Sequence, residues 1–310
     1  MGTEDHATSA SEASALEASA LGGAASEGAA RERAASWGPT LEDWVEAYVR
    51  STRLEEKLAP PPLPAGARFR EGGVRPLRLE GPGRDPRLRV SARADRVPRA
   101  GALREASAVA RLLHVFTHHE VQAAELCGWA ILAFPDTPAS FREGLLGILQ
   151  DEVRHAAVYG RRIEELGSGY GSHAVRDWFW ERALGCRTAL QYVALMGLGF
   201  EGGNLEHARR FDEQLTAAGD VRSAALVARV GREEVAHVHF AARWFSRWTG
   251  VEEASGPDFD RWAAELPRPL TPAVLRGTPL DRERRGRAGL SAAFLDRLEE
   301  ANDTRAGSQR

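Results

Sequence analysis

The chain has 310 residues, of which 43% are hydrophobic and 27% are charged, and its formal net charge is −3. The hydrophobic content is ample for a folded core, while the small net charge favours neither a nucleic acid nor an acidic substrate as a partner. Three features predict a reducing, cytoplasmic setting without membrane attachment. The two cysteines do not form a CxxC pair, no apolar run approaches the roughly 20 residues that span a bilayer, and no signal-peptide pattern is present.

The first ordered segment is expected to begin near Trp37. Residues 1–36 are mostly Ala, Ser, Glu and Gly, so they cannot bury enough apolar surface to offset the entropy of ordering, and we predict that they are disordered. Thr40-Leu-Glu-Asp43 has the spacing of a capping box, and the apolar residues that follow predict a helix running to about Lys57.

An extended arm is predicted over residues 60–99, which with the preceding helix makes up a segment of residues 37–101. The arm is rich in Pro, Gly and Arg and has no sustained hydrophobic period. It carries ten arginines against four acidic residues. We expect it to lie on acidic helix surfaces, with a nucleic-acid contact as the alternative.

Four long helices are predicted within residues 102–250, and together they would form an all-α, ferritin-like four-helix bundle with a long crossover between the second and third helices. The two halves read as a degenerate repeat of helical hairpins. A tail at 251–310 should add short helices and pack on the bundle. The expected helices are 102–134, 140–166, 186–218 and 220–249, with short ones at 174–184 in the crossover and at 257–265 and 290–302 in the tail.

Two Glu-x-x-His motifs lie 82 residues apart, and each follows a lone glutamate by about thirty residues. All of these residues fall in the middle of an apolar face that a bundle would bury. A buried carboxylate must be neutralised, paired or coordinated to metal. Four carboxylates and two imidazoles at one point are the ligands of a dinuclear iron or iron–manganese site, whereas buried Glu–Arg or Glu–His pairs are the alternative. The predicted metal ligands are Glu120, Glu152, His155, Glu201, Glu234 and His237.

Further residues are candidates for supporting these ligands. Asp151 and Glu233 each precede a motif glutamate, and we expect each to accept a ring proton from the histidine of the opposite helix, the alternative being solvated surface charge. Tyr159 follows His155 by one turn and could relay protons or electrons, or be a core ring. His118 and Glu125 share another stripe of the first helix, where polar surface facing the arm is the alternative.

Four glycines surround Glu201 in the segment Met196-Gly-Leu-Gly-Phe-Glu-Gly-Gly203. Each costs roughly 1 kcal/mol relative to alanine within a helix. The segment therefore predicts a bend, a π-bulge or room for oxygen or substrate beside the metals, or else close packing between helices. Trp178, Phe179 and Trp180 on the crossover are interpreted as bundle cover or as a lid over a substrate pocket.

The strings HHEVQAAEL, QDEVRHA, MGLGFEGGNLEH and EEVAHV, found in this order, resemble a bacterial ferritin-like family called domain of unknown function 455. The resemblance covers about residues 40 to 300. It implies a ferritin-like fold and a metal site formed by the same six residues, and it favours a role for Glu125. The wider class includes rubrerythrins, ribonucleotide reductase small subunits, multicomponent monooxygenases and a di-iron tRNA hydroxylase.

Three functions remain open at this point. The first is an oxidoreductase with two iron ions, or iron and manganese, that uses O2 to oxidise or hydroxylate a small molecule held near residues 197–203. This first function is compatible with an external electron donor. The second is iron handling or peroxide scavenging without an organic substrate. The third is an RNA-modifying hydroxylase whose arm grips phosphates. Monomer and homodimer are equally compatible with the sequence.

Overall fold

A computed structural model describes residues 36–70, 72–92 and 97–301, and within them all regular elements are helical apart from a single bridge between Val90 and Val175. The predicted disorder of residues 1–36 lies, except for Ser36, outside the described residues. The first half of the chain contains α2 (Leu41–Arg50), α3 (Leu54–Leu58), η1 (Ala100–Arg104), α4 (Ala106–Ala133), α5 (Ala139–Glu165) and α6 (Trp178–Ala183). The second half contains α7 (Ala189–Leu195), η2 (Met196–Glu201), α8 (Gly202–Ala218), α9 (Val221–Thr249), η3 (Glu253–Ser255), α10 (Phe259–Glu265), α11 (Pro272–Leu275), α12 (Arg282–Arg287) and α13 (Ala292–Glu300).

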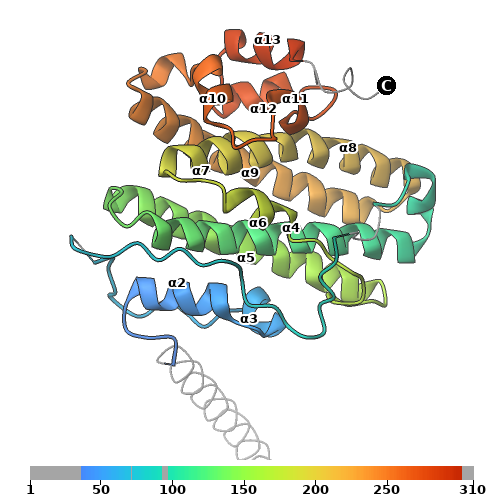
Figure 1. Ribbon diagram of the computed structural model, residues 1–310. Helices are drawn as coiled ribbons and strands as arrows, with labels where there is room; N and C mark the ends of the chain where they lie inside the picture. Colours follow the sequence, from blue (N-terminus) through green and yellow to red (C-terminus); the bar gives the residue numbers. More distant parts are fainter. Residues whose placement is uncertain (1–35, 71, 93–96, 302–310) are drawn as a thin grey trace, which may run out of the picture.

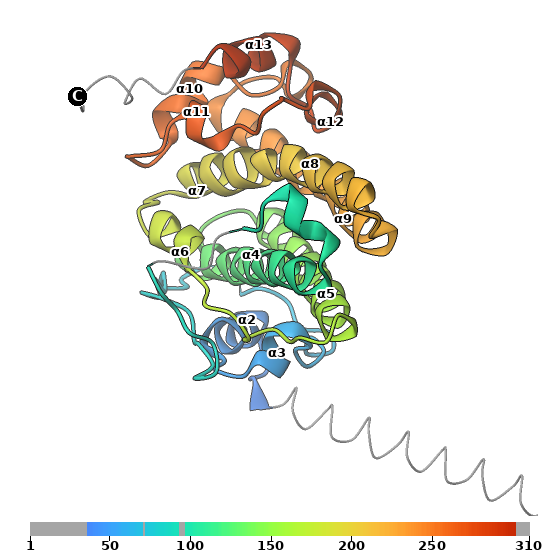
Figure 2. The ribbon, with the colours of Figure 1, turned by 90° about the vertical axis from the view of Figure 1, so that its right-hand side faces the viewer.

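The helices are stacked in layers (Figures 1 and 2). Helices α4 and α5 pack along each other as one hairpin, and α8 and α9 pack as a second hairpin. The hairpins meet where α5 contacts α9. Helices α2 and α3 cover the outer side of the α4–α5 hairpin, while α10 to α13 cover α7, α8 and α9 on the opposite side. The N-terminal and C-terminal segments thus enclose the two hairpins from either side.

The first predicted helix is wrong in its length. A capping box at Thr40 starts α2 as expected, but the helix ends at Arg50 and Ser51 turns to an extended conformation. The reason is that Leu54 N–H donates to the Asp85 carboxylate of the arm, which starts a separate helix α3 at that point. Lys57 then folds back onto the end of α2, so its side chain lies inside the molecule.

The third helix is interrupted rather than continuous. It runs as α7, then as a π-helical turn, η2, and then as α8. The turn is held by close neighbours, because a Cβ on Gly197 would lie 2.2 Å from the Ala241 Cβ and one on Gly203 would lie 2.8 Å from the Leu275 carbonyl oxygen. Two of the predicted explanations of this glycine-rich segment therefore apply, because it contains a π-helical turn and its glycines permit close packing.

The C-terminal tail is fastened to α7 and α8 by buried polar contacts. Arg285 and Glu206, each only 1% exposed, form a two-pronged ion pair with distances of 2.7 and 2.8 Å. Trp262 Nε1 donates to the Ala194 carbonyl at 2.9 Å. The short helices α11 and α12 were not predicted from the sequence; α11 lies against η2, and α12 lies against α8 and α9.

The core is divided along the hairpins. On α4, α5 and α9 one apolar cluster lies toward one end, and a second lies toward the other end. Along α4, for example, Leu113 belongs to one cluster and Ala124 to the other, and Glu120 lies between them. The same division occurs on α5 and α9, so a polar layer crosses the core at the level of the Glu-x-x-His motifs. In the part of the chain that the structure describes, no helix is both long enough and apolar enough to span a membrane.

Candidate metal centre

The structure brings all six predicted ligand residues together in this polar layer. Glu120 comes from α4, Glu201 from the last position of η2, and α5 and α9 each supply a glutamate and a histidine. The i, i+3 spacing puts the glutamate and the histidine of each motif on the same inward face. The residues form two groups of four, and within each group the potential ligand atoms lie within 4.8 Å of one another. The groups are Glu120, Glu152, His155 and Glu234, and Glu152, Glu201, Glu234 and His237.

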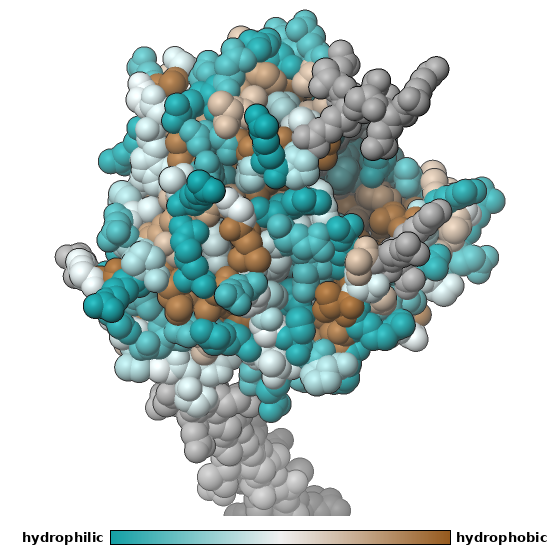
Figure 3. Space-filling model, viewed as in Figure 1, coloured by the Kyte–Doolittle hydropathy of each residue, from teal (hydrophilic) through white to brown (hydrophobic). Residues whose placement is uncertain are grey.

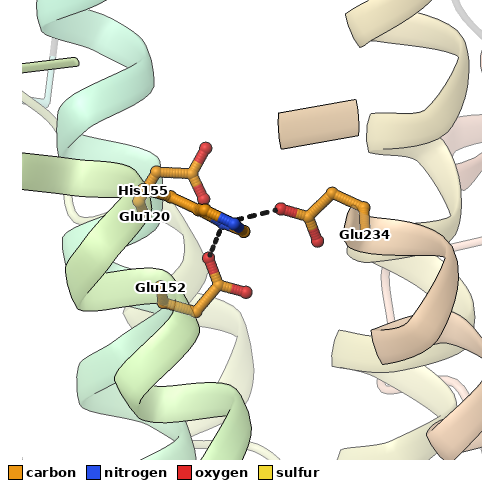
Figure 4. Close-up of side chains that lie close together, drawn as sticks. All are labelled: Glu120, Glu152, His155 and Glu234. Carbon is orange, nitrogen blue, oxygen red and sulfur yellow. Dashed lines mark ion pairs between the residues drawn. The ribbon is translucent and has the colours of Figure 1, made fainter. Parts of the chain in front are cut away.

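Glu152 and Glu234 belong to both groups, and both are fully buried. Figure 4 shows Glu234 reaching from α9 toward Glu120, Glu152 and His155 on the α4–α5 hairpin. The Nδ1 atom of His155 lies 3.4 Å from Glu152 and 3.3 Å from Glu234. The Nδ1 atom of His237 lies 2.9 Å and 3.0 Å from the same two carboxylates. Two carboxylates shared between two ligand groups are what a pair of adjacent ions requires.

The donor atoms of the cluster are suited to metal ions. Both carboxylate oxygens of Glu152, Oε1 of Glu234 and Nδ1 of His155 are buried and lack a hydrogen bond of acceptable geometry. Buried polar atoms are normally hydrogen-bonded, so such a concentration within one layer calls for another partner. Carboxylate oxygens and imidazole nitrogens are ligands of iron and manganese. The residues present therefore fit a dinuclear metal centre.

The charges of the cluster also favour the binding of cations. Burial and repulsion from the neighbouring carboxylates raise the pKa of Glu120 and Glu201 well above the ordinary value. Burial opposes a charged His155, but the nearby Glu152 and Glu234 carboxylates outweigh this effect and raise its pKa to about 10. Four carboxylates thus face only two imidazoles. Two divalent cations would offset all four negative charges and leave the histidines neutral.

The outward ring nitrogen of each histidine contacts a carboxylate from the opposite helix. Nε2 of His155 lies 2.8 Å from Glu233 on α9, and Nε2 of His237 lies 3.3 Å from Asp151 on α5. Such partners fix the tautomer and ring orientation of a ligating histidine. Arg154, which the sequence reasoning missed, donates to both of these carboxylates, at 2.5 Å to Asp151 and 2.7 Å to Glu233. Its place inside the first motif, directly before the histidine, was the available signal.

Tyr159 lies next to the cluster, one turn along α5 from His155. Its side chain is buried, and its ring packs against Phe116 with centroids 5.7 Å apart. Burial, together with the negative charges of Glu120, Glu234 and Glu152, raises its pKa well above the ordinary value. The phenol is therefore held protonated beside the carboxylates.

His118 and Glu125 do not join the cluster. Nε2 of His118 lies 3.1 Å from Asp177, and its Nδ1 lies 2.7 Å from the hydroxyl of Tyr170. The Glu125 carboxylate, which is fully buried, contacts Lys57 and Arg84 instead. The positions of His118 and Glu125 therefore do not agree with the expectation that they support the metal ligands. Both lie on the face of α4 opposite Glu120, where they contact the crossover, the arm and α3.

Several arm arginines bind other parts of the protein. Arg84 donates to Glu125 and to Asp177, and Arg78 donates to the backbone carbonyls of Cys186 and Arg187. These contacts agree with the predicted arm that lies on the helices. They also tie the arm, α4 and the crossover to one another.

A cavity of about 190 Å³ opens beside the cluster on the side of α4 and η2, and Glu120 and Glu201 form part of its wall. Trp178 and Phe179 of the crossover line it, whereas Trp180 is buried and donates to Glu125 at 2.9 Å. His119 and His207, to which the sequence reasoning gave no role, also line this cavity. Because His119 lies next to Glu120 and His207 follows Glu201 by six residues, their positions relative to the ligands were the available signal.

A smaller space of about 30 Å³, lined mostly by apolar side chains, also borders Glu201. It reaches Glu201 and His237 and is bounded by Cys127, Tyr192 and Gly197, among others. This volume is sufficient for a small molecule such as water or O2.

Comparisons with known proteins agree with the resemblance read from the sequence. A family model described as "Protein of unknown function (DUF455)" matches residues 43–296, a range that includes all six residues of the cluster. No curated protein matches the chain, and no solved structure matches it. The family match spans most of the sequence, from the first turn of α2 into α13, so this chain belongs to the DUF455 family.

Proposed function

We propose that the chain is a ferritin-like dinuclear metal protein that uses O2 to oxidise or hydroxylate a small molecule. The observation that carries this proposal is the pair of overlapping four-ligand groups that share Glu152 and Glu234. The two hairpins joined by a long crossover are the arrangement on which a ferritin-like bundle holds such a site. Membership of the ferritin-like superfamily is part of the proposal.

Two iron ions, or one iron and one manganese, are the proposed occupants. Glu120 and His155 would complete one ion's ligands, and Glu201 and His237 would complete the other's. Bound iron would supply the redox chemistry with O2 that the side chains lack. The surrounding residues have their own tasks: Asp151 and Glu233 orient the histidines, and the buried apolar clusters keep bulk water from the layer.

The cavity beside Glu120 and Glu201 supports an organic substrate. It brings a molecule of limited size against two of the proposed ligands, which iron storage alone does not require. Hydroxylation would use one O2 and two electrons from an external donor. One oxygen atom would enter a C–H bond, and the other would leave as water after taking up two protons.

The first test is metal content followed by O2 consumption. The full chain is loaded anaerobically with Fe(II) or Mn(II), freed of excess metal and analysed for metal per chain. Two ions per chain are expected for the wild-type protein. The same number is expected for the control Glu143→Ala, which removes an exposed carboxylate from α5. The double variant Glu152→Ala/Glu234→Ala should bind none. Retained metal in the double variant, or many more than two irons per wild-type chain, would contradict the proposal.

A further inference from the structure

The cavity beside the metal centre has a distinctly aromatic wall. Phe179 and Phe200 stack on each other with ring centroids 4.6 Å apart and an interplanar angle of 17°. His119 lies against Phe179 at 4.9 Å, and Trp178 lies against Phe200 at 4.9 Å. These four rings come from α4, α6 and η2, so three separate elements converge to build one aromatic surface. Leu275 of the tail also lines the cavity.

The polar groups of the cavity are few. Glu120 and Glu201 lie where the cavity meets the metal centre, and His119, His207 and Asn204 supply hydrogen-bonding groups on its wall. Arg276 also lines the cavity, but its guanidinium donates to the backbone carbonyls of Leu298 and Glu299 at the end of α13. Its positive charge is thus already directed at a helix carboxyl end.

The volume limits the size of a ligand. An apolar cavity of about 150 Å³ holds benzene. A cavity of about 190 Å³ therefore has room for one aromatic ring with a small substituent, and it is too small to enclose a whole nucleotide or fatty acid.

We propose that this cavity binds a neutral, single-ring aromatic molecule that carries one hydrogen-bonding substituent, such as a phenol or an aniline. The ring contacts the aromatic wall, and the substituent meets His119, His207 or Asn204. A neutral ligand is specified because Arg276, the one arginine among the described residues that line the cavity, already donates to the end of α13 and does not offer its charge to an anion. The oxidation of this molecule rests on the proposed function, but its binding depends on the cavity alone.

The test is a binding titration by calorimetry and ligand-observed NMR on the full chain, both metal-free and metal-loaded. The probes are p-cresol and p-toluidine, compared with 4-methylcyclohexanol of similar size and with the anion p-toluate. Both aromatic probes should bind at least tenfold more tightly than either comparison molecule. Equal binding of 4-methylcyclohexanol would overturn the aromatic assignment, and preferred binding of p-toluate would overturn the neutral one.

Two exposed valines offer a matched pair of variants. Val274, 46% exposed, lines the cavity from the short helix α11, whereas Val221, 67% exposed, starts α9 and does not line it. Val274→Trp should weaken p-cresol binding at least tenfold by occupying the entrance, and Val221→Trp should leave it unchanged. Equal effects of both substitutions, or no effect of Val274→Trp, would place the ligand elsewhere.

The two proposals fail in different ways. If p-cresol binds the metal-free chain but the metal analysis finds no ions, the cavity assignment stands and the metal function falls. If two ions bind but neither aromatic probe binds in either form, the metal centre stands and the aromatic ligand class is wrong.

Discussion

Nζ of Lys57 lies 2.8 Å from Oε1 of Glu125, and both side chains are almost completely buried between α3 and α4. Lys57 also donates to the carbonyls of Tyr48 and Val49 at 2.7 and 2.8 Å, which closes the carboxyl end of α2. The Glu125 carboxylate also accepts two hydrogen bonds from Arg84 of the arm. One buried ion cluster therefore joins the N-terminal helices, the arm and the first hairpin.

Replacing Lys57 should destabilise the fold without changing the proposed metal centre. Lys57→Met removes one partner of a buried charge and leaves two helix-end carbonyls without their donor, so the free energy of unfolding should fall by about 3 kcal/mol. Urea unfolding followed by circular dichroism measures this. Arg50→Met is the control, because it breaks an exposed pair with Glu46 and should cost about 0.5 kcal/mol or less.

Measuring metal content distinguishes the role of the buried ion cluster around Glu125 from that of the proposed metal ligands. Two ions per chain are still expected in folded Lys57→Met, because Glu125 and its partners do not contribute to either four-ligand group. A loss of metal in this variant at a temperature where it remains folded would show that the ion cluster acts on the metal centre after all.

Asp177 should make part of the stability dependent on pH. Burial raises its pKa, but hydrogen bonds from His118 and Arg84 outweigh burial and lower the pKa from 3.8 to about 2. Because the folded pKa is depressed, the stabilising contribution is complete well above pH 4 and is lost as the pH falls toward 2. The shift corresponds to about 2 kcal/mol at pH 6 and about half of that at pH 3.

The measurement is the difference in unfolding free energy between wild type and Asp177→Asn at pH 6 and at pH 3. The groups facing Asp177 are Arg84 from the arm and His118 from α4, with Glu125 on the far side of Arg84. The difference should shrink at the lower pH. The control Asp296→Asn, which alters an exposed pair with Arg282, should show a small difference at both pH values, and a constant difference for Asp177→Asn would refute the assignment.

The cluster of four glutamates and two histidines could be foreseen from the sequence because helical periodicity is a local property. The i, i+3 spacing fixed which face Glu152 and His155 share, and the apolar residues above and below them indicated that this face is buried. The cross-helix contacts of Asp151 and Glu233 followed from their positions next to the motifs. All-helical architecture was predictable for the same reason.

What the sequence left open depends on contacts between distant segments. Glu125 is surrounded by apolar residues on α4, but its partners Lys57 and Arg84 lie in segments whose path no periodicity reveals. The end of α2 at Arg50 likewise depends on Asp85, over thirty residues away. The cavity needs four such segments at once, so only its glycine-rich and tryptophan-rich pieces could be noticed.

The shared carboxylates should matter more for metal binding than the unshared ones. Glu152→Ala or Glu234→Ala removes a ligand from both groups, whereas Glu120→Ala removes one from a single group. We expect well below one ion per chain for the first two variants and about one for Glu120→Ala, measured by elemental analysis after anaerobic Fe(II) loading. Circular dichroism should show an intact helical signal in each. Equal metal content in Glu120→Ala and Glu152→Ala would exclude shared ligation by Glu152.

Two glycines on long helices should respond to the same substitution in opposite directions. A Cβ on Gly203 of α8 would lie 2.8 Å from the Leu275 carbonyl oxygen, a backbone atom of the tail that cannot rotate away, whereas one on the exposed Gly147 of α5 would meet no atom within 4 Å. Gly147→Ala should therefore raise the unfolding free energy by about 1 kcal/mol, because alanine is the better helix former. Gly203→Ala should lower it by about 1 to 3 kcal/mol, because the gain in helix propensity is smaller than the cost of moving α11.

Since α11 forms one side of the cavity, Gly203→Ala should also weaken p-cresol binding while Gly147→Ala leaves it unchanged. Urea unfolding and calorimetry measure the two effects, and a stabilising Gly203→Ala would mean that the tail does not pack against η2 and α8 in solution as it does here.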